Sequence, residues 1–369
     1  MIEKDFISNP YKKSIENGSF TWSSPSNIAL VKYWGKKENQ IPENPSISFT
    51  LNNCKTTTTV SFSKKQLNTD FSLEVFLDGQ LKTDFKPKIL TFFNRIETYL
   101  PFLKDYHFKI ETSNTFPHSS GIASSASGMS ALALCLMSIE KELIKSSVIP
   151  SAVEESHNED FFIKKASFLA RLGSGSACRS LEGDIVVWGK HDTIEGSSDL
   201  FGVKYPYEIH NNFKNYQDTI LLVDKGEKQV SSSVGHNLMY GHPFAQKRFK
   251  QANKNLSNVV SILKKGSLDA FIALVESEAL TLHAMMMTSM PYFILMKPNT
   301  LEIINKIWSY REKTNSKLCF TLDAGANVHV LYPESETKTC LEFIQNELVA
   351  YCQNGQYICD RIGFGAKQL

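Results

Sequence analysis

A loop of small residues at positions 117–128, PHSSGIASSASG, has a composition that suits phosphate binding. Glycine lets a backbone approach a ligand closely, and the apolar run after the loop predicts a helix whose first N–H groups favour an anion. The hydroxyls of Ser124 and Ser125 add hydrogen-bond donors or a ligand for Mg²⁺. Composition alone is explained equally well by a connector capped with serine. The sequence contains neither a Walker GxxxxGK[ST] loop nor a dinucleotide GxGxxG loop.

Three further stretches carry residues that suit phosphate and acid–base chemistry. Residues 25–37, PSNIALVKYWGKK, place lysines around an aromatic pair, although an amphipathic strand end has the same pattern. Residues 171–180, RLGSGSACRS, combine serines with Arg179, whose guanidinium suits bidentate binding of phosphate. Residues 320–330, FTLDAGANVHV, place Asp323 at the end of an apolar strand, where it is either a turn residue or a base.

The first half of the chain has the element order of an α+β protein. Alternating, β-branched or apolar runs predict strands at 46–63, 73–81 with an Asp-Gly turn, 107–114 and 184–189. Apolar residues at helical spacing predict helices at 86–100, after the small-residue loop, and near 161–172.

A polar segment at 190–199, KHDTIEGSSD, separates the two halves of the chain. We place a boundary at about residue 195, so that the predicted domains are 1–195 and 196–369. The predicted elements of the second half are a strand at 219–224, helices near 244–264, 268–285 and 299–312, a strand at 317–325, and a final helix and strand.

Charge and cysteine content indicate which partners and which cellular compartment to expect. The 40 basic and 38 acidic residues give a net charge of +2 without a basic stripe, so neither a nucleic acid nor a membrane surface is the expected partner. Seven widely spaced cysteines without a Cys-x-x-Cys pair indicate reduced thiols in the cytoplasm. The N-terminus lacks the apolar core of a signal peptide, and the apolar run near 131–139 is shorter than a membrane span. We expect a soluble protein with a small-molecule ligand.

Taken together, the four stretches resemble one protein family. The pattern P-x-x-x-G-[LI]-x-S-S-A at 117–126 resembles the ATP phosphate loop of the GHMP kinase superfamily. Five stretches resemble the diphosphomevalonate decarboxylases within it, namely NIALVKYWGK (27–36), FPHSSGIASSASG (116–128), GSGSACRSLEG (173–183), KQVSSSVG (228–235) and DAGAN (323–327). Kinase members usually have a Gly-Glu-His type sequence in place of KYWGK and lack GSGSACRS.

The resemblance implies ATP- and Mg²⁺-dependent decarboxylation of mevalonate 5-diphosphate to isopentenyl diphosphate. ATP would phosphorylate the tertiary 3-hydroxyl, loss of that phosphate would leave a cation-like centre, and CO₂ would depart as the double bond forms. It also implies a two-domain α+β fold, with an N-terminal domain like that of ribosomal protein S5 and a ferredoxin-like C-terminal domain. The active site would lie between these domains, and the protein would be a homodimer.

The family's catalytic aspartate and lysine match Asp323 and Lys32. By this resemblance, Asp323 would act on the 3-hydroxyl as a base or orienting acceptor and later face the positive charge. Lys32 would keep Asp323 ionised and neutralise the transferring phosphoryl group. Ser125 would orient the γ-phosphate or bind Mg²⁺, and Arg179 would bind the substrate carboxylate or diphosphate.

The resemblance assigns further residues to binding. Those that would cradle the ATP phosphates are Gly121, Ile122, Ala123, Ser124, Ser125, Ala126 and Ser127. Those that would bind the substrate, besides Arg179, are Tyr33, Lys36, Ser174, Ser176, Ser231, Ser232 and Lys88. The sequence departs from the usual pattern at Gln40, Pro45, Lys88, Ala326 and His236.

Two of these departures, Gln40 and Lys88, fall where the 5-diphosphate would be recognised, and Lys88 there takes the place of an arginine. A relative that decarboxylates mevalonate 5-phosphate is therefore an alternative. A mevalonate 3-kinase is a second, although the kinase variants lose the lysine and aspartate that this chain keeps. A non-catalytic sensor of the same fold is the alternative from another class. His283 and the methionines after it, together with Cys178, are predicted to be packed residues rather than a metal site or a nucleophile.

Overall fold

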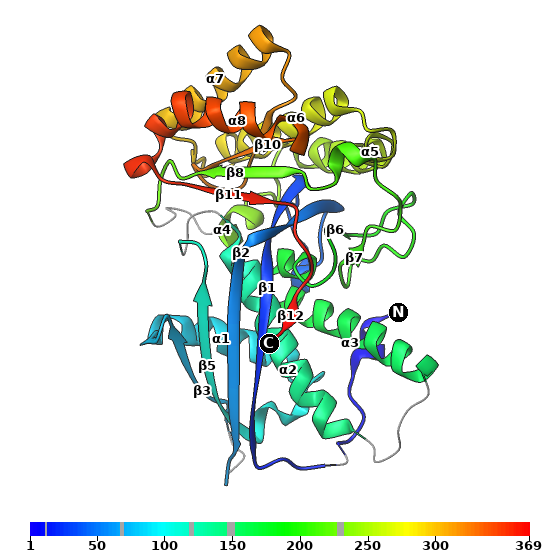
Figure 1. The fold of residues 1–369 in the computed structure, drawn as a ribbon. Coiled ribbons are helices and arrows are strands. Elements are labelled where there is room, and N and C mark those ends of the chain that lie inside the picture. Colours follow the sequence, from blue (N-terminus) through cyan, green and yellow to red (C-terminus); the bar gives the residue numbers. More distant parts are fainter. Residues whose placement is uncertain (12, 67–69, 118–121, 146–151, 227–231) are drawn as a thin grey trace.

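Figure 1 shows two parts, each built from a β-sheet and helices, with the longer strands in the lower part. The computed structural model describes residues 1–11, 13–66, 70–117, 122–145, 152–226 and 232–369. Helices and strands occur in both parts, which confirms the predicted α+β class.

The larger sheet contains β1 (Asn17–Val31), β2 (Ser46–Lys64), β3 (Ser72–Leu77), β4 (Gln80–Leu81), β5 (Tyr106–Asn114), β6 (Ile185–Trp188), β7 (Val203–Lys204) and β12 (Lys367–Gln368). The smaller sheet contains β8 (Gln217–Leu221), β9 (Cys319–Leu322), β10 (Val328–Tyr332) and β11 (Tyr357–Arg361). The α-helices are α1 (Lys86–Ile96), α2 (Ser124–Ile144), α3 (Ala152–Gly173), α4 (Ser232–Asn237), α5 (Ala245–Lys265), α6 (Leu268–Met287), α7 (Pro298–Thr314) and α8 (Thr337–Phe343). A short 3-10 helix, η5 (Gly175–Arg179), follows α3.

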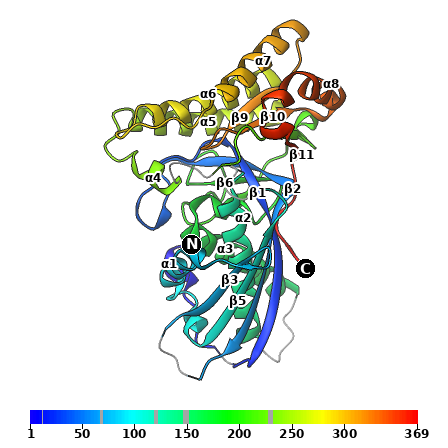
Figure 2. The same cartoon turned by 90° about the vertical axis from the view of Figure 1, so that its left-hand side faces the viewer.

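The larger sheet has the order β12-β1-β2-β5-β3-β4, and β6 pairs with β2. Burial alternates along the second half of β2, because one face of the strand packs on the core while the other meets solvent. Figure 2 shows α1, α2 and α3 together on one side of this sheet. Helix α2 packs against β1, β2 and α3, and residues 129–140 of this helix are all buried. The start of α2 at Ser124 is thereby held by the larger core.

The predicted Asp-Gly turn is confirmed between β3 and β4. Phe76 lies opposite Leu81 in an antiparallel pair. Asp78 and Gly79 have φ values of 50° and 77°, the left-handed pair that a tight hairpin requires.

The smaller sheet has the order β11-β8-β10-β9, and all its strands are antiparallel. Asp360 of β11 fastens it to the larger sheet by accepting hydrogen bonds from the backbone N–H groups of Asn52, Asn53 and Cys54, at 2.9, 2.8 and 2.7 Å. These three residues belong to β2, so the two sheets are joined through backbone groups of a central strand.

Two strands beyond residue 195 return to the larger sheet. Strand β7 pairs with β6, and β12 pairs with β1 near the C-terminus. The smaller sheet begins at β8. The boundary at residue 195 stays a prediction.

Helix α6 is long and apolar enough to cross a membrane by length and composition, but 61% of its most apolar window is buried inside the protein. It packs against β9, α5 and β1. Its apolar residues therefore serve the core in this structure.

Candidate active site

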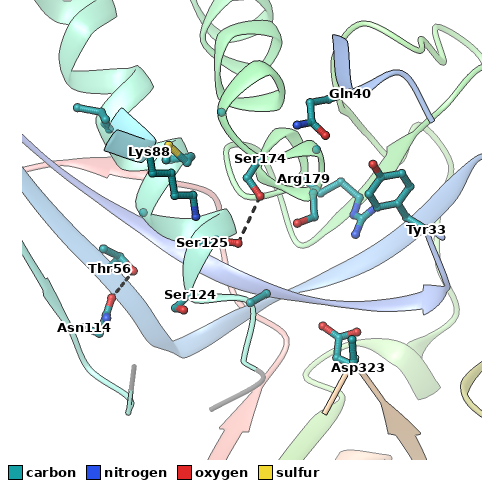
Figure 3. Close-up of a pocket in the computed structure, with 18 of the residues that line it drawn as sticks. Tyr33, Gln40, Thr56, Lys88, Asn114, Ser124, Ser125, Ser174, Arg179 and Asp323 are labelled. Atoms are coloured by element: carbon teal, nitrogen blue, oxygen red, sulfur yellow. Dashed lines mark hydrogen bonds between the residues drawn. The ribbon is translucent and has the colours of Figure 1, made fainter. Parts of the chain in front are cut away.

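A pocket of about 530 Å³ lies where the two parts of the molecule meet. Its walls come from the segment after β1, from β2, β3 and β5, from α1, the start of α2 and η5, and from α6 and the turn after β9. Figure 3 shows Tyr33, Lys88, Ser125, Arg179 and Asp323 arranged around this space. Most of the residues assigned to the site from the sequence line the pocket.

Lys32 and Asp323 meet in this pocket although they lie 291 positions apart in the sequence. Lys32 follows the last residue of β1, and Asp323 follows the last residue of β9. The Lys32 Nζ atom lies 3.2 Å from Asp323 Oδ1. The Lys32 side chain is 2% exposed and that of Asp323 is 28% exposed, so the carboxylate reaches the pocket while the ammonium supports it from inside.

Burial lowers the pKa of Lys32, and the charges of Asp323 and Glu278 oppose this effect. The neighbouring carboxylates thus stabilise the protonated, positively charged form of Lys32 against the effect of burial. A cation held in this way is suited to stabilise negative charge on a transferring phosphoryl group.

The first residues of α2, where the phosphate cradle is predicted, line the pocket. Ala123 has a φ of 45°, a left-handed conformation that turns the chain into the helix at Ser124. The Ser125 side chain is exposed, and its hydroxyl lies 3.3 Å from that of Ser174 on the neighbouring loop (Figure 3). Helix N–H groups and two exposed or half-exposed hydroxyls therefore face the same space, an arrangement that suits an anion.

Three other residues assigned to the cradle have buried side chains, and the backbone N–H groups of Ala126 and Ser127 donate to the carbonyl oxygen of Ala123. Ala126 and Ile122 are buried in two different hydrophobic clusters. The Ser127 hydroxyl is buried and lies 2.6 Å from that of Thr56 on β2. Gly121 lies outside the described residues.

Arg179, in η5, lines the pocket as expected and is itself buried. Its guanidinium donates to Asn27 Oδ1 at 3.4 Å and to the Ser46 hydroxyl, and it lies over the Trp188 ring, 5.8 Å from the centroid. Burial lowers its pKa from the ordinary value. These contacts fix the guanidinium before any ligand arrives, which reduces the entropy lost on binding.

Some of the remaining residues assigned to substrate binding lie together at the pocket, and others do not. Tyr33, Lys36, Ser174 and Ser176 all line the pocket. The Tyr33 ring packs edge-on against Trp188, and its buried hydroxyl has no hydrogen-bond partner among the described residues. A buried donor without a partner is costly, and a ligand could satisfy it.

Two of the assigned serines cannot be placed at the pocket. Ser231 lies outside the described residues. Ser232 is the first residue of α4, and its side chain is not described. Their roles stay predictions.

Three of the departures from the family pattern also line the pocket, namely Gln40, Lys88 and His236. The amine of Lys88 points toward Ser125 across the space between α1 and α2 (Figure 3). The surrounding protein lowers its pKa, although the side chain as a whole is exposed. Burial lowers the pKa of His236 to about 3, so this imidazole is neutral at physiological pH.

An apolar wall beside the cradle was missed from the sequence. Its residues are Val75, Leu77, Phe85, Ile89 and Ile110, and polar groups next to it come from Thr56, Thr58, Thr112 and Asn114. The sequence pattern that could have indicated this wall is the alternation along the strands. It places every second residue of β2, β3 and β5 on the face toward α2. The sequence could not predict that part of this face remains open to the pocket.

Among the described residues, no cluster of three or more His, Cys, Asp and Glu side chains could hold a metal ion. Hydroxyls and phosphate oxygens are nevertheless ordinary ligands for Mg²⁺, which keeps several waters. Ser125 fits that requirement. Cys178 is buried, and burial raises the pKa of its thiol to about 12, which confirms its prediction as a packed residue. All seven cysteines are free.

Comparison with known proteins relates this chain to one family. A family model described as "Diphosphomevalonate decarboxylase-like N-terminal domain" matches residues 24–199, and one described as "Mevalonate 5-diphosphate decarboxylase C-terminal domain" matches residues 219–362. The diphosphomevalonate decarboxylase of Ganoderma lucidum is 30% identical over 366 residues, which cover 94% of this chain and 85% of that relative.

Solved structures agree with this result. One described as "MDDEF in complex with MVAPP, AMPPCP and Magnesium" is 28% identical, with a TM-score of 0.78, and the alignment covers 96% of this chain and 99% of that one. A structure of mevalonate diphosphate decarboxylase from Enterococcus faecalis is 27% identical, with a TM-score of 0.77 and the same coverage of both chains. The two-domain GHMP kinase fold is thereby confirmed, and the chain belongs to the diphosphomevalonate decarboxylase family.

Proposed function

We propose that this protein catalyses the ATP-dependent decarboxylation of mevalonate 5-diphosphate to isopentenyl diphosphate, with release of ADP, phosphate and CO₂. The observation that carries the proposal is the contact of Lys32 with Asp323 in a pocket that also contains the start of α2. The names and ligands of the relatives support it, since they are diphosphomevalonate decarboxylases and one was solved with MVAPP, AMPPCP and magnesium.

Asp323 is the group that acts on the 3-hydroxyl of the substrate. Its half-exposed carboxylate accepts the hydroxyl proton as the oxygen attacks the γ-phosphorus of ATP. When the 3-phosphate later leaves, the same carboxylate faces the carbon that becomes positive and stabilises it. Loss of CO₂ then supplies the electron pair of the new double bond.

Lys32 and Arg179 supply positive charge to the negatively charged groups around the reacting carbon. The Lys32 ammonium keeps the neighbouring carboxylate ionised and offsets negative charge on the phosphoryl group. Arg179, fixed by Asn27 and Ser46, binds the substrate carboxylate or its diphosphate. Tyr33, Lys36, Ser174 and Ser176 complete the substrate site.

The start of α2 holds the phosphates of ATP through N–H groups and the hydroxyls of Ser124 and Ser125. Mg²⁺ neutralises the phosphate charges when bound, and Ser125 is the residue that would contact it. The apolar wall formed by β3, β5 and α1 is suited to the adenine base.

The decisive experiment is a parallel assay of mevalonate, its 5-phosphate and its 5-diphosphate, with ADP and CO₂ followed together. We expect equal release of ADP and CO₂, with the highest kcat/KM for the 5-diphosphate. A preference for the 5-phosphate would identify a phosphomevalonate decarboxylase. ADP without CO₂ would identify a 3-kinase, and neither product with any of the three would favour the non-catalytic sensor.

Replacement of Lys88 tests the recognition of the substrate phosphates. Lys88→Ala is expected to raise the KM for mevalonate 5-diphosphate about tenfold, equal to about 1.4 kcal/mol, while kcat changes less. The reason is that the amine reaches the pocket but lies away from Asp323 (Figure 3). Lys86→Ala, an exposed change on the same helix and outside the pocket, is the matched control. An unchanged KM in Lys88→Ala would remove Lys88 from the site.

The homodimer and the cytoplasmic location stay predictions from the sequence.

A further inference from the structure

Helix α6 contacts the backbone of both members of the catalytic pair. The Lys32 N–H donates to Glu278 Oε2 at 2.9 Å. Five residues further along the helix, His283 Nε2 donates to the carbonyl oxygen of Asp323 at 3.1 Å. Glu278 is fully buried and His283 is 1% exposed, so neither contact competes with bulk water.

Glu278 is held in place by a second helix. Arg248 of α5 donates to Glu278 through Nη2 at 2.6 Å and through Nη1 at 3.1 Å, and both side chains have no exposed surface. Asn255 donates to the same carboxylate at 2.6 Å. Arg248 also donates to the Lys32 carbonyl oxygen at 3.1 Å, as does Asn44 at 2.9 Å. The Lys32 backbone is therefore bound at its N–H and at its C=O.

We propose that Glu278 and His283 are positioning residues, which use one helix to set the distance between the Lys32 ammonium and the Asp323 carboxylate. The two catalytic side chains come from different sheets, and no strand pairing joins the ends of β1 and β9. Helix α6 is packed against both strands and binds a backbone group next to each. The inference rests on the proposed function, because it assigns these residues to the same reaction.

The same helix provides a matched control. Glu276 lies two residues before Glu278 and also accepts two hydrogen bonds from an arginine, Arg311, at 2.6 and 3.1 Å. Glu276 also accepts from Trp308, and it has no contact with Lys32 or Asp323 among its described hydrogen bonds. Glu276→Gln therefore removes a similar buried charge without touching the catalytic pair.

Glu278→Gln is expected to lower kcat about 10²-fold, with the KM for ATP and for substrate nearly unchanged, because a small misplacement of reacting groups has an effect of this size. Glu276→Gln should lower thermal stability but leave kcat within about twofold. Equal losses of kcat in both variants would overturn the inference, as would a change confined to KM.

His283 gives an independent test if Glu278→Gln does not fold. Burial lowers the pKa of His283 to about 4, so the ring is neutral and its replacement removes no charge. His283→Leu should lower kcat, and His283→Gln, which keeps an N–H donor, should recover most of the loss. His242→Leu is the control, because His242 contacts the carbonyl oxygen of Met285 at 3.2 Å, outside the pocket. Equal activity of His283→Leu and His283→Gln would contradict the proposed role.

The pKa of Lys32 provides a measurement that needs no substrate. Among the described residues, the charged and titratable groups that face Lys32 are Asp323 of the β9–β10 turn, Glu278 and His283 of α6, Arg248 of α5, Arg179 of η5 and Asp218 of β8. Glu278→Gln removes one negative charge and leaves Arg248 unbalanced, so the protonated form of Lys32 is destabilised and its pKa falls. The alkaline limb of the kcat/KM profile should then move to lower pH.

This pKa can be followed by NMR of isotope-labelled lysine, with Lys32→Met to identify the signal. A lower Lys32 pKa in Glu278→Gln than in Glu276→Gln would support the coupling, and equal pKa values would overturn it. A wild-type protein that releases no CO₂ but shows this pKa difference would contradict the proposed function alone. The two failures are thus distinguishable.

Discussion

Asp323→Asn is expected to lower kcat by about 10³-fold or more while ATP and substrate still bind. The asparagine keeps the shape of the side chain and an oxygen for Lys32, whose Nζ lies 3.2 Å from the carboxylate. It cannot take the proton of the 3-hydroxyl, and it carries no charge to stabilise the cation-like centre. Steady-state release of ADP and CO₂, with calorimetric binding of ATP, measures both effects.

The control for this variant is Asp224→Asn. Asp224 is 39% exposed at its side chain and lies outside the pocket, although its backbone N–H donates to Asn327 of the same turn as Asp323. We expect its turnover to remain within about twofold of wild type. Near-normal turnover in Asp323→Asn would refute the role assigned to the carboxylate.

Lys32→Met should lower kcat on the order of 10³-fold, since it removes a fixed charge from a site where negative charge develops. Methionine has a similar length and suits the buried position, which is 2% exposed at its side chain. Asp323 keeps contact with solvent, so its charge does not become trapped without a partner. The fold should therefore survive, which circular dichroism and thermal melting can verify.

Two further lysine variants test whether the loss of kcat is specific to the Lys32 ammonium. Lys32→Arg keeps the charge but places a larger, planar group at a buried position, and we expect little recovery of activity. Lys37→Met changes an exposed lysine outside the pocket, which pairs with the Glu43 carboxylate at 3.8 Å, and its kcat should equal that of the wild type. A Lys32→Met protein with wild-type kcat would show that the ammonium takes no part in the reaction.

Much of the fold was predictable because its signals are local. The Asp78-Gly79 turn, the alternation along β2 and the apolar spacing of α5 and α7 are properties of short segments, and each gave the element found in the structure. Pairings between distant segments were not predictable in this way. The return of β7 and β12 to the larger sheet depends on packing across many residues and has no local signal.

By itself, the sequence determined the chemistry that the chain offers. The small residues before α2, the lysine after β1 and the aspartate after β9 each sit where an element begins or ends, and such positions have recognisable local patterns. Only the tertiary structure decided that Lys32 meets Asp323 and that one face of the larger sheet is open to the pocket. It also decided that Glu278 and His283 of α6 bind the backbone of Lys32 and Asp323. Buried polar partners are chosen by the packing of distant elements, and the hydrophobic periodicity of a helix does not reveal which of its polar residues will be enclosed with a partner.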